Sequence, residues 1–129
     1  MAQEVDSLVK SVVILCEDSP IGKNSAVEAI RMGAGITAVG DLDECKIIFL
    51  GDSVYFLSKN FDPEKVNRDA PSNIFRLMEL SDLDVYALDS ALEIAGINHS
   101  DLIEYDNVKV ASIQEISKFV LEADVMYRY

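Results

Sequence analysis

Cys16 is the residue best placed in this sequence to do chemistry. It ends a short apolar, β-branched run, residues 11–15, and a polar turn and a helix-forming segment follow it. The start of a helix and the cation of Lys23 favour a reactive thiolate, whereas the carboxylates of Glu17 and Asp18 oppose one. Two interpretations stay open: Cys16 fills space at a strand end, or it is a reactive thiol that carries sulfur.

The turn after Cys16 offers a second kind of site. Backbone N–H groups at the start of a helix bind small anions, so Ser19, Gly22, Lys23 and Asn24 are candidate ligand-binding residues. The alternative is a loop that Pro20 and Gly22 shape without any ligand. In open α/β sheets ligands collect at the carboxyl ends of strands, which is where this turn lies.

Two nucleotide-binding motifs are excluded. Gly22-Lys23 resembles the centre of a P-loop, but Glu17 stands where the first glycine belongs and Asn24 where the hydroxyl belongs. A carboxylate beside a polyphosphate is electrostatically unfavourable. The glycines at 33, 35 and 40 have the wrong last spacing for a dinucleotide fingerprint and lie in or after a helix.

The remaining candidates for metal or thiol chemistry are weak. His99 lies in an expected solvated loop with Asp101 and Glu104 nearby, and no metal site or cofactor is expected. Cys45 begins an apolar run and is assigned to packing. Because neither cysteine belongs to a C-x-x-C pair, we expect two reduced, buried cysteines.

Charge and composition narrow the function classes. The chain has 129 residues, half of them hydrophobic, and a net charge of −12. One domain over residues 1–129 is expected, with residues 1–9 as a frayed lead-in. The scattered lysines and arginines disfavour direct nucleic-acid binding. No apolar run is long enough to span a membrane, and the acidic start does not resemble a secretion signal, so a cytoplasmic location is expected.

Apolar runs and helix-forming segments alternate along the chain. The pattern predicts a parallel, doubly wound α/β sheet with strands at residues 11–16, 45–50, 83–88, 107–111 and 124–129. Residues 54–57 are ambiguous between a helical turn and a strand extension.

Helices are predicted in the intervening segments, at residues 25–39, 62–67, 72–80, 90–95 and 113–123. Three of them have capping-box spacing at their start, namely Ser25 with Glu28, Ser90 with Glu93, and Ser112 with Glu115. Small residues along the first helix, Ala26, Ala29, Gly33 and Thr37, predict a close approach to a neighbouring element. Segment 72–80 is apolar on several sides, so it is either deeply covered or partly faces a partner.

These motifs together resemble the DsrE/DsrF family of sulfur-relay proteins, most closely its DsrF or TusC branch. The shared features are Pro20-x-Gly22 in the first turn, residues 47–54 (Ile-Ile-Phe-Leu-Gly-Asp-Ser-Val), a helix closed by Gly96, and a last strand at residues 124–129. The resemblance covers about residues 10–129. It implies a three-layer α/β/α domain, flavodoxin-like, with strand order 4-3-2-1-5.

The same resemblance implies an assembly and a departure from the family chemistry. Family members form trimers or hexamers, sometimes with DsrE- and DsrH-like partner subunits, and pass persulfide sulfur in tRNA thiolation or sulfur oxidation. DsrE-type carriers hold a reactive cysteine just after the third strand, about where this chain has Ala87. We therefore expect a structural or interaction subunit without catalysis of its own. The alternatives are a carrier or transferase that uses Cys16 and a ligand binder without turnover.

Overall fold

The computed structural model describes residues 9–20, 24–40, 42–61 and 72–129 of the chain. Two expected segments lie outside these ranges, namely the frayed lead-in, of which only residue 9 is described, and the short helix at residues 62–67, as do the candidate ligand-binding residues Gly22 and Lys23. All other expected strands and helices fall on described residues.

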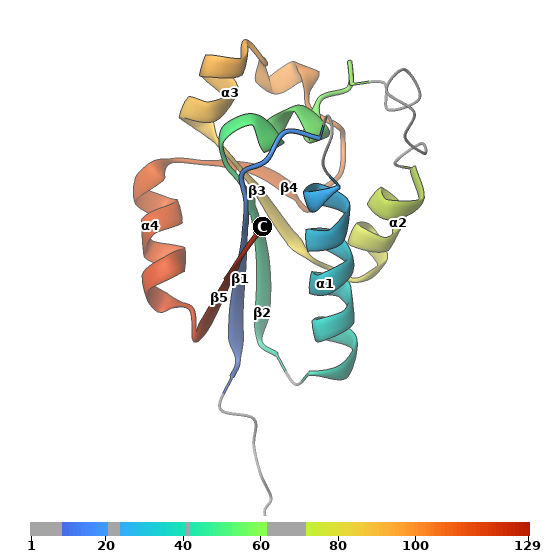
Figure 1. Ribbon diagram of the computed structural model, residues 1–129, viewed down its shortest axis with the longest axis vertical. Coiled ribbons are helices and arrows are strands. Elements are labelled where there is room, and N and C mark those ends of the chain that lie inside the picture. Colours follow the sequence, from blue (N-terminus) through green and yellow to red (C-terminus); the bar gives the residue numbers. More distant parts are fainter. Residues whose placement is uncertain (1–8, 21–23, 41, 62–71) are drawn as a thin grey trace, which may run out of the picture.

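The described strands form one five-stranded sheet in which every pair is parallel. Its order, β4-β3-β2-β1-β5, confirms the expected parallel α/β fold and the order 4-3-2-1-5 (Figure 1). The strands are β1 (Ser11–Cys16), β2 (Glu44–Phe49), β3 (Asp84–Leu88), β4 (Val108–Ala111) and β5 (Val125–Arg128).

Burial explains why the two central strands are so apolar. In β2 every residue after Glu44 is buried, and β1 is buried at four of its six positions. Parallel strands covered on both faces read as continuous apolar runs. The edge strands β4 and β5 are only partly buried, so polar and apolar residues alternate in β4.

Helices cover both faces of the sheet and complete the three layers (Figure 1). One face packs against α1 (Ser25–Val39), α2 (Ser72–Leu80), α3 (Asp89–Ala95) and the 3-10 helix η1 (Gly51–Leu57), which settles the ambiguity at residues 54–57. The other face packs against α4 (Ile113–Glu122), through Ile116, Phe119 and Val120. Ile113, expected on the same apolar stripe, is instead half exposed.

The second face also buries a lysine. Lys46 is 8% exposed, and its ammonium group pairs with Glu44 and lies 5.0 Å from the centre of the Phe119 ring. A buried ammonium group requires such compensation, since an unpaired charge in an apolar environment is strongly unfavourable.

The helix ends confirm one capping box and contradict two. Ser112 accepts a hydrogen bond from the Glu115 backbone N–H, and the Glu115 carboxylate accepts one from Ser112, as expected. The first helix instead has Asn24 as its N-cap, because Ser25 already lies in the helix. Likewise α3 begins directly after β3, with Leu88 as N-cap, so Ser90 is one residue inside it.

The structure also tests the predicted end of α3 at Gly96 and the apolar character of α2. Gly96 ends α3 in the left-handed conformation, φ 73°, where glycine is unstrained. In α2 the residues Ile74, Phe75 and Met78 are buried, whereas Leu80 is 73% exposed. The helix is therefore covered on one side only.

The small residues of α1 allow it to lie close to the sheet. Ala26, Ala29 and Gly33 are buried. A Cβ atom at Gly33 would lie 3.1 Å from Ile47 Cδ1 and 3.4 Å from Leu83 Cδ1. Gly35, two residues on, is exposed and has no such neighbour within 4 Å among the described atoms.

We predict that Gly33→Val destabilises the fold by roughly 1–3 kcal/mol, because the added side chain must displace Ile47 and Leu83. Gly35→Val is the matched control and changes stability by less than about 0.5 kcal/mol, since valine and glycine have comparable helix propensities. Urea unfolding followed by circular dichroism measures both. Equal stability of the two variants would contradict the close approach of α1.

Candidate functional site

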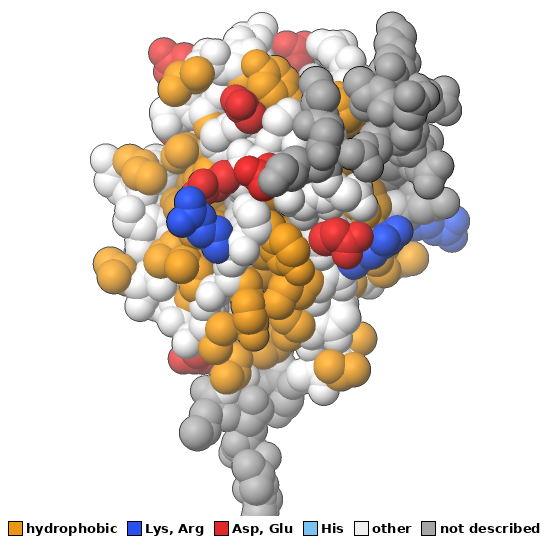
Figure 2. Space-filling model, in the orientation of Figure 1, with side chains coloured by type: hydrophobic (Ala, Val, Ile, Leu, Met, Phe, Trp, Pro, Cys, Tyr) orange, Lys and Arg blue, Asp and Glu red, His pale blue; other side chains and the backbone are white. Residues whose placement is uncertain are grey.

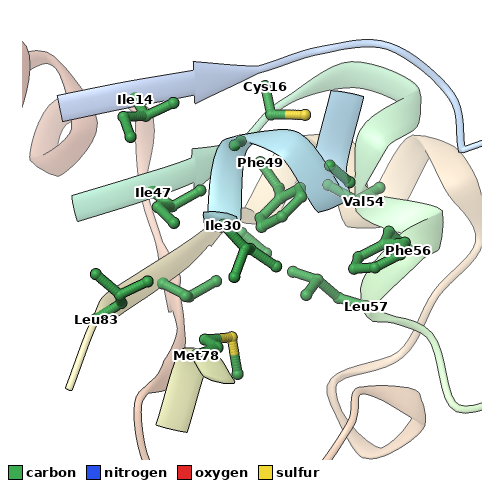
Figure 3. Packing of buried hydrophobic residues seen from close by; sticks show 14 of the residues in the cluster. Ile14, Cys16, Ile30, Ile47, Phe49, Val54, Phe56, Leu57, Met78 and Leu83 are labelled. Atoms are coloured by element: carbon green, nitrogen blue, oxygen red, sulfur yellow. The ribbon is translucent and has the colours of Figure 1, made fainter. Parts of the chain in front are cut away.

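Cys16 lies at the carboxyl end of β1, at the point where the sheet meets η1. Its side chain is 0% exposed and belongs to the same buried cluster as Phe49 and Val54 (Figure 3). The position matches the sequence expectation, but the burial means that the thiol does not face solvent. A partner protein would have to open this part of the core to reach the sulfur.

Ser53 ties the ends of the two central strands together around Cys16. Its hydroxyl lies 2.6 Å from the backbone oxygen of Cys16 and 2.7 Å from that of Leu50. The backbone N–H of Leu50 also donates to the Cys16 carbonyl, at 2.8 Å. Sequence reasoning missed this role of Ser53, although Gly51-Asp52-Ser53 directly after an apolar run marks the strand end.

The surroundings of Cys16 favour the protonated thiol. The pKa of Cys16 is raised to about 11, chiefly by burial and to a smaller extent by the negative charges of Asp18 and Glu17. A hydrogen bond with Ser53 acts in the opposite direction and is outweighed. Since the thiolate is the nucleophile, this thiol is almost wholly unreactive at neutral pH.

Cys45 is equally enclosed and lies far from Cys16. Its side chain is buried, and burial raises its pKa, against a smaller opposing effect of the neighbouring Thr37 hydroxyl. The register pairs Cys45 with Val12 and Cys16 with Phe49, four residues further along. At about 3.3 Å per residue the two cysteines are about 13 Å apart along the strands, too far for a disulfide.

The candidate anion site is only partly described. Gly22 and Lys23 lie outside the described residues, so the expectation that they bind a ligand with Ser19 and Asn24 stays a prediction. The Asn24 side chain donates to Glu28 at 3.4 Å, and Ser25 donates to Asp18 at 3.4 Å. These carboxylates at the start of α1 oppose the binding of an anion.

The end of β3 is where DsrE-type carriers were expected to hold their cysteine. Ala87 lies inside β3 and is 0% exposed, and the strand passes directly into α3 at Asp89. The residues of this junction, Leu88, Asp89 and Ser90, include no cysteine. A shallow hollow of about 640 Å³ adjoins it, lined by Asp89, Ser90, Leu92, Glu93, Ile97, Asn98 and His99.

His99 and its neighbours do not converge on a metal position. His99 and Asp101 form a short 3-10 helix, in which Asp101 accepts a hydrogen bond from the Asn98 backbone N–H. Glu104 instead pairs with Lys59 at 2.7 Å, which lowers the pKa of its carboxyl group. Within the described ranges there is no group of three or more metal-binding side chains. The described helices also include none with the length and apolar character to cross a membrane.

We predict that neither cysteine reacts with a thiol reagent in the native protein at pH 8. Both thiols are buried and their pKa values are raised, so thiolate is scarce and inaccessible. Titration with a disulfide reagent in native buffer and in guanidinium chloride measures this. Two thiols are expected per chain after unfolding; rapid labelling of Cys16 in the native state would contradict the burial.

Stability is predicted to fall as the pH rises from 9 to 11. The ordinary pKa of a cysteine is 9.0 and that of Cys16 is about 11 in the fold, so the unfolded chain releases its proton first. The stabilisation is complete below pH 9 and is lost as the pH approaches the folded pKa. Urea unfolding between pH 8 and 11 tests this, and Cys16→Ala should show a smaller loss over the same range.

Comparison with solved structures supports the fold. The ychN protein from E. coli matches with a TM-score of 0.75 and 18% identity, over 93% of this chain and 99% of its own. The protein of unknown function MTH1491 from Methanobacterium thermoautotrophicum matches with a TM-score of 0.67 and 17% identity, over 94% of this chain and 99% of its own. The conserved protein of unknown function BT1422 from Bacteroides thetaiotaomicron matches with a TM-score of 0.63 and 13% identity, over 92% of this chain and 95% of its own.

The sequence comparisons give the family. A search of curated proteins finds no significant match. The sequence model of the DsrE/DsrF-like family, by contrast, matches residues 10–127. This match covers nearly all the strands and helices described above. The chain therefore belongs to the DsrE/DsrF-like family.

Proposed function

We propose that this chain is a DsrF- or TusC-like subunit of a sulfur-relay assembly, with a structural or interaction role. The observation that carries the proposal is the state of its thiols. Cys16 and Cys45 are buried with raised pKa values, and the junction of β3 and α3 has no cysteine. A family member without a reactive thiol can contribute by binding and positioning subunits that have one.

The proposal includes a setting for the chain. The assembly is a homo-oligomer, trimeric or hexameric, or a complex with DsrE- and DsrH-like partner subunits, and it works in the cytoplasm. The half-covered helix α2, with Leu80 exposed, supports contact with another subunit. The acidity of the chain, −12 overall, fits a partner with a basic face.

The rival proposal, sulfur transfer by Cys16 itself, has weaker support. It needs a thiolate at neutral pH and a path for the incoming sulfur. Burial and the two neighbouring carboxylates, Glu17 and Asp18, disfavour the thiolate. The packing of η1 over the strand end closes the path for the incoming sulfur. Only the position of Cys16 at a strand end favours it.

We predict that the tagged full-length chain, purified gently from its own cells, copurifies with a family partner that carries the persulfide. Alkylation of the sample followed by mass spectrometry locates the persulfide on each chain. The expected result is modification of a partner cysteine and none of Cys16 or Cys45. Cys16→Ser and Cys45→Ser are the matched pair, and both should leave the partner's persulfide unchanged.

Two results would contradict the proposal. One is a folded monomer that copurifies with nothing. The other is a persulfide on Cys16 together with loss of sulfur transfer in Cys16→Ser alone. The second result would favour the rival proposal.

A further inference from the structure

The two faces of the sheet are covered unequally. Among the described helices α1, α2, α3 and η1 pack against one face, whereas α4 alone packs against the other (Figure 1). Within α4, which is described throughout, Ile116 is the single buried residue, and Leu121 is 84% exposed. Helices in proteins are stabilised mostly by the packing of their apolar face, so α4 is held weakly.

Phe119 makes the other main contact between α4 and the sheet. Its ring lies 4.8 Å from that of Tyr86 in β3 and 5.0 Å from the ammonium group of Lys46 in β2. Lys46 is 8% exposed and pairs with Glu44, but the cost of removing such a charge from water can exceed the attraction within the pair. Detachment of α4 would return the ammonium group to water, so this contact contains a group that favours opening.

The strand after α4, β5, is attached mainly through polar groups. Among the described strands it pairs with β1 alone. The Asp124 carboxylate accepts hydrogen bonds from the backbone N–H groups of Lys10, at 2.8 Å, and Ser11, at 3.0 Å. At the other end Arg128 pairs with Glu17 at 2.9 Å, and their side chains are 67% and 39% exposed. Ion pairs that water can reach contribute little to stability.

The apolar side chains of β5 are also largely open to solvent. Met126 and Tyr127 are 45% and 41% exposed. Figure 2 shows hydrophobic side chains at the surface of the central region, where Figure 1 has β5 in front of the sheet. The strand therefore buries little apolar area against the rest of the chain.

We infer that α4 and β5, residues 112–129, detach from the sheet as one unit while β1 to β4 and the helices of the first face stay folded. Segments with few buried apolar contacts and exposed polar attachments open at a lower free energy than the core. Two residues alone, Ala123 and Asp124, connect α4 to β5. Such a short connection prevents either element from moving far without the other.

Opening would uncover the second face of the sheet. Val13, Ile48 and Ala111 belong to the cluster beneath α4 and are buried in the closed chain. Cys16 would stay covered, because it belongs to the cluster on the first face. The chain thus has an apolar surface that it presents only in the open state. This inference goes beyond the proposed function and does not depend on it.

A pair of cysteine probes in the full chain tests the opening. Val13→Cys places a thiol beneath α4, and Val85→Cys places one on the first face; the two valines are 1% and 0% exposed. A disulfide reagent at pH 8, without denaturant, should label Val13→Cys about ten-fold faster or more than Val85→Cys, because the first needs only local opening. Wild type is the blank, since its own cysteines are buried.

Substitutions in the contact should change the labelling of Val13→Cys in opposite directions. Phe119→Ala should speed it about ten-fold or more, because it removes the ring that packs on the sheet. Lys46→Met should slow it, since a methionine gains nothing from water when α4 leaves. Leu121→Ala is the matched control for Phe119→Ala, because it truncates an exposed side chain of the same helix, and it should leave the rate unchanged.

Amide hydrogen exchange of the wild type, followed by NMR, tests whether α4 and β5 open together. Their amides should share one free energy of opening and one dependence on low urea concentrations, both smaller than those of the amides in β1, β2 and β3. Phe119→Ala should lower the free energy of opening equally for α4 and for β5. Simple fraying of the edge strand would show no dependence on urea.

Three results would overturn the inference. The first is equal labelling of Val13→Cys and Val85→Cys. The second is exchange of the α4 amides only through global unfolding. The third is a β5 whose exchange does not respond to Phe119→Ala. None of them bears on the proposed function, which is decided by the copurifying partner and the position of the persulfide.

Discussion

Strands β1 and β2 are covered on both faces, and the rest of the structure depends on this burial. It requires a helix close against each face, which the small residues of α1 permit on one side and α4 provides on the other. It also places Cys16 in the core, because the thiol belongs to the same face as Val12 and Ile14. The position of Cys16 at a strand end suggests a nucleophile, but the packing that stabilises the sheet keeps its thiol buried and protonated.

The carboxyl end of the sheet shows the same relation between packing and chemistry. In α/β proteins this end commonly binds ligands, because loops there leave space between strand and helix. Here η1 follows β2 directly and Ser53 binds the ends of both central strands, so the space beside β1 is filled. Asp18 and Glu28 then surround the start of α1 with negative charge. Packing and charge together leave the β3–α3 junction, with its shallow hollow, as the more open part of this end.

The sequence predicts the elements that depend on local patterns and fails where distant residues decide. The first strand and helix are predicted with their observed bounds, because a continuous apolar run and a small-residue helix are strong signals. The strand order required a family resemblance, since pairings such as β1 with β5 join residues more than a hundred positions apart. The caps at Ser25 and Ser90 are wrong because spacing alone does not fix where a chain turns. Ser53 was missed because its partners come from two different strands.

The enclosure of both thiols has a consequence for how the chain withstands oxidative stress. Peroxide attacks thiolates, and the products range from reversible sulfenic acid to irreversible sulfonic acid. A chain whose cysteines remain protonated within the core offers such oxidants little to modify. It would keep its shape in conditions that inactivate a protein bearing an exposed, reactive sulfur.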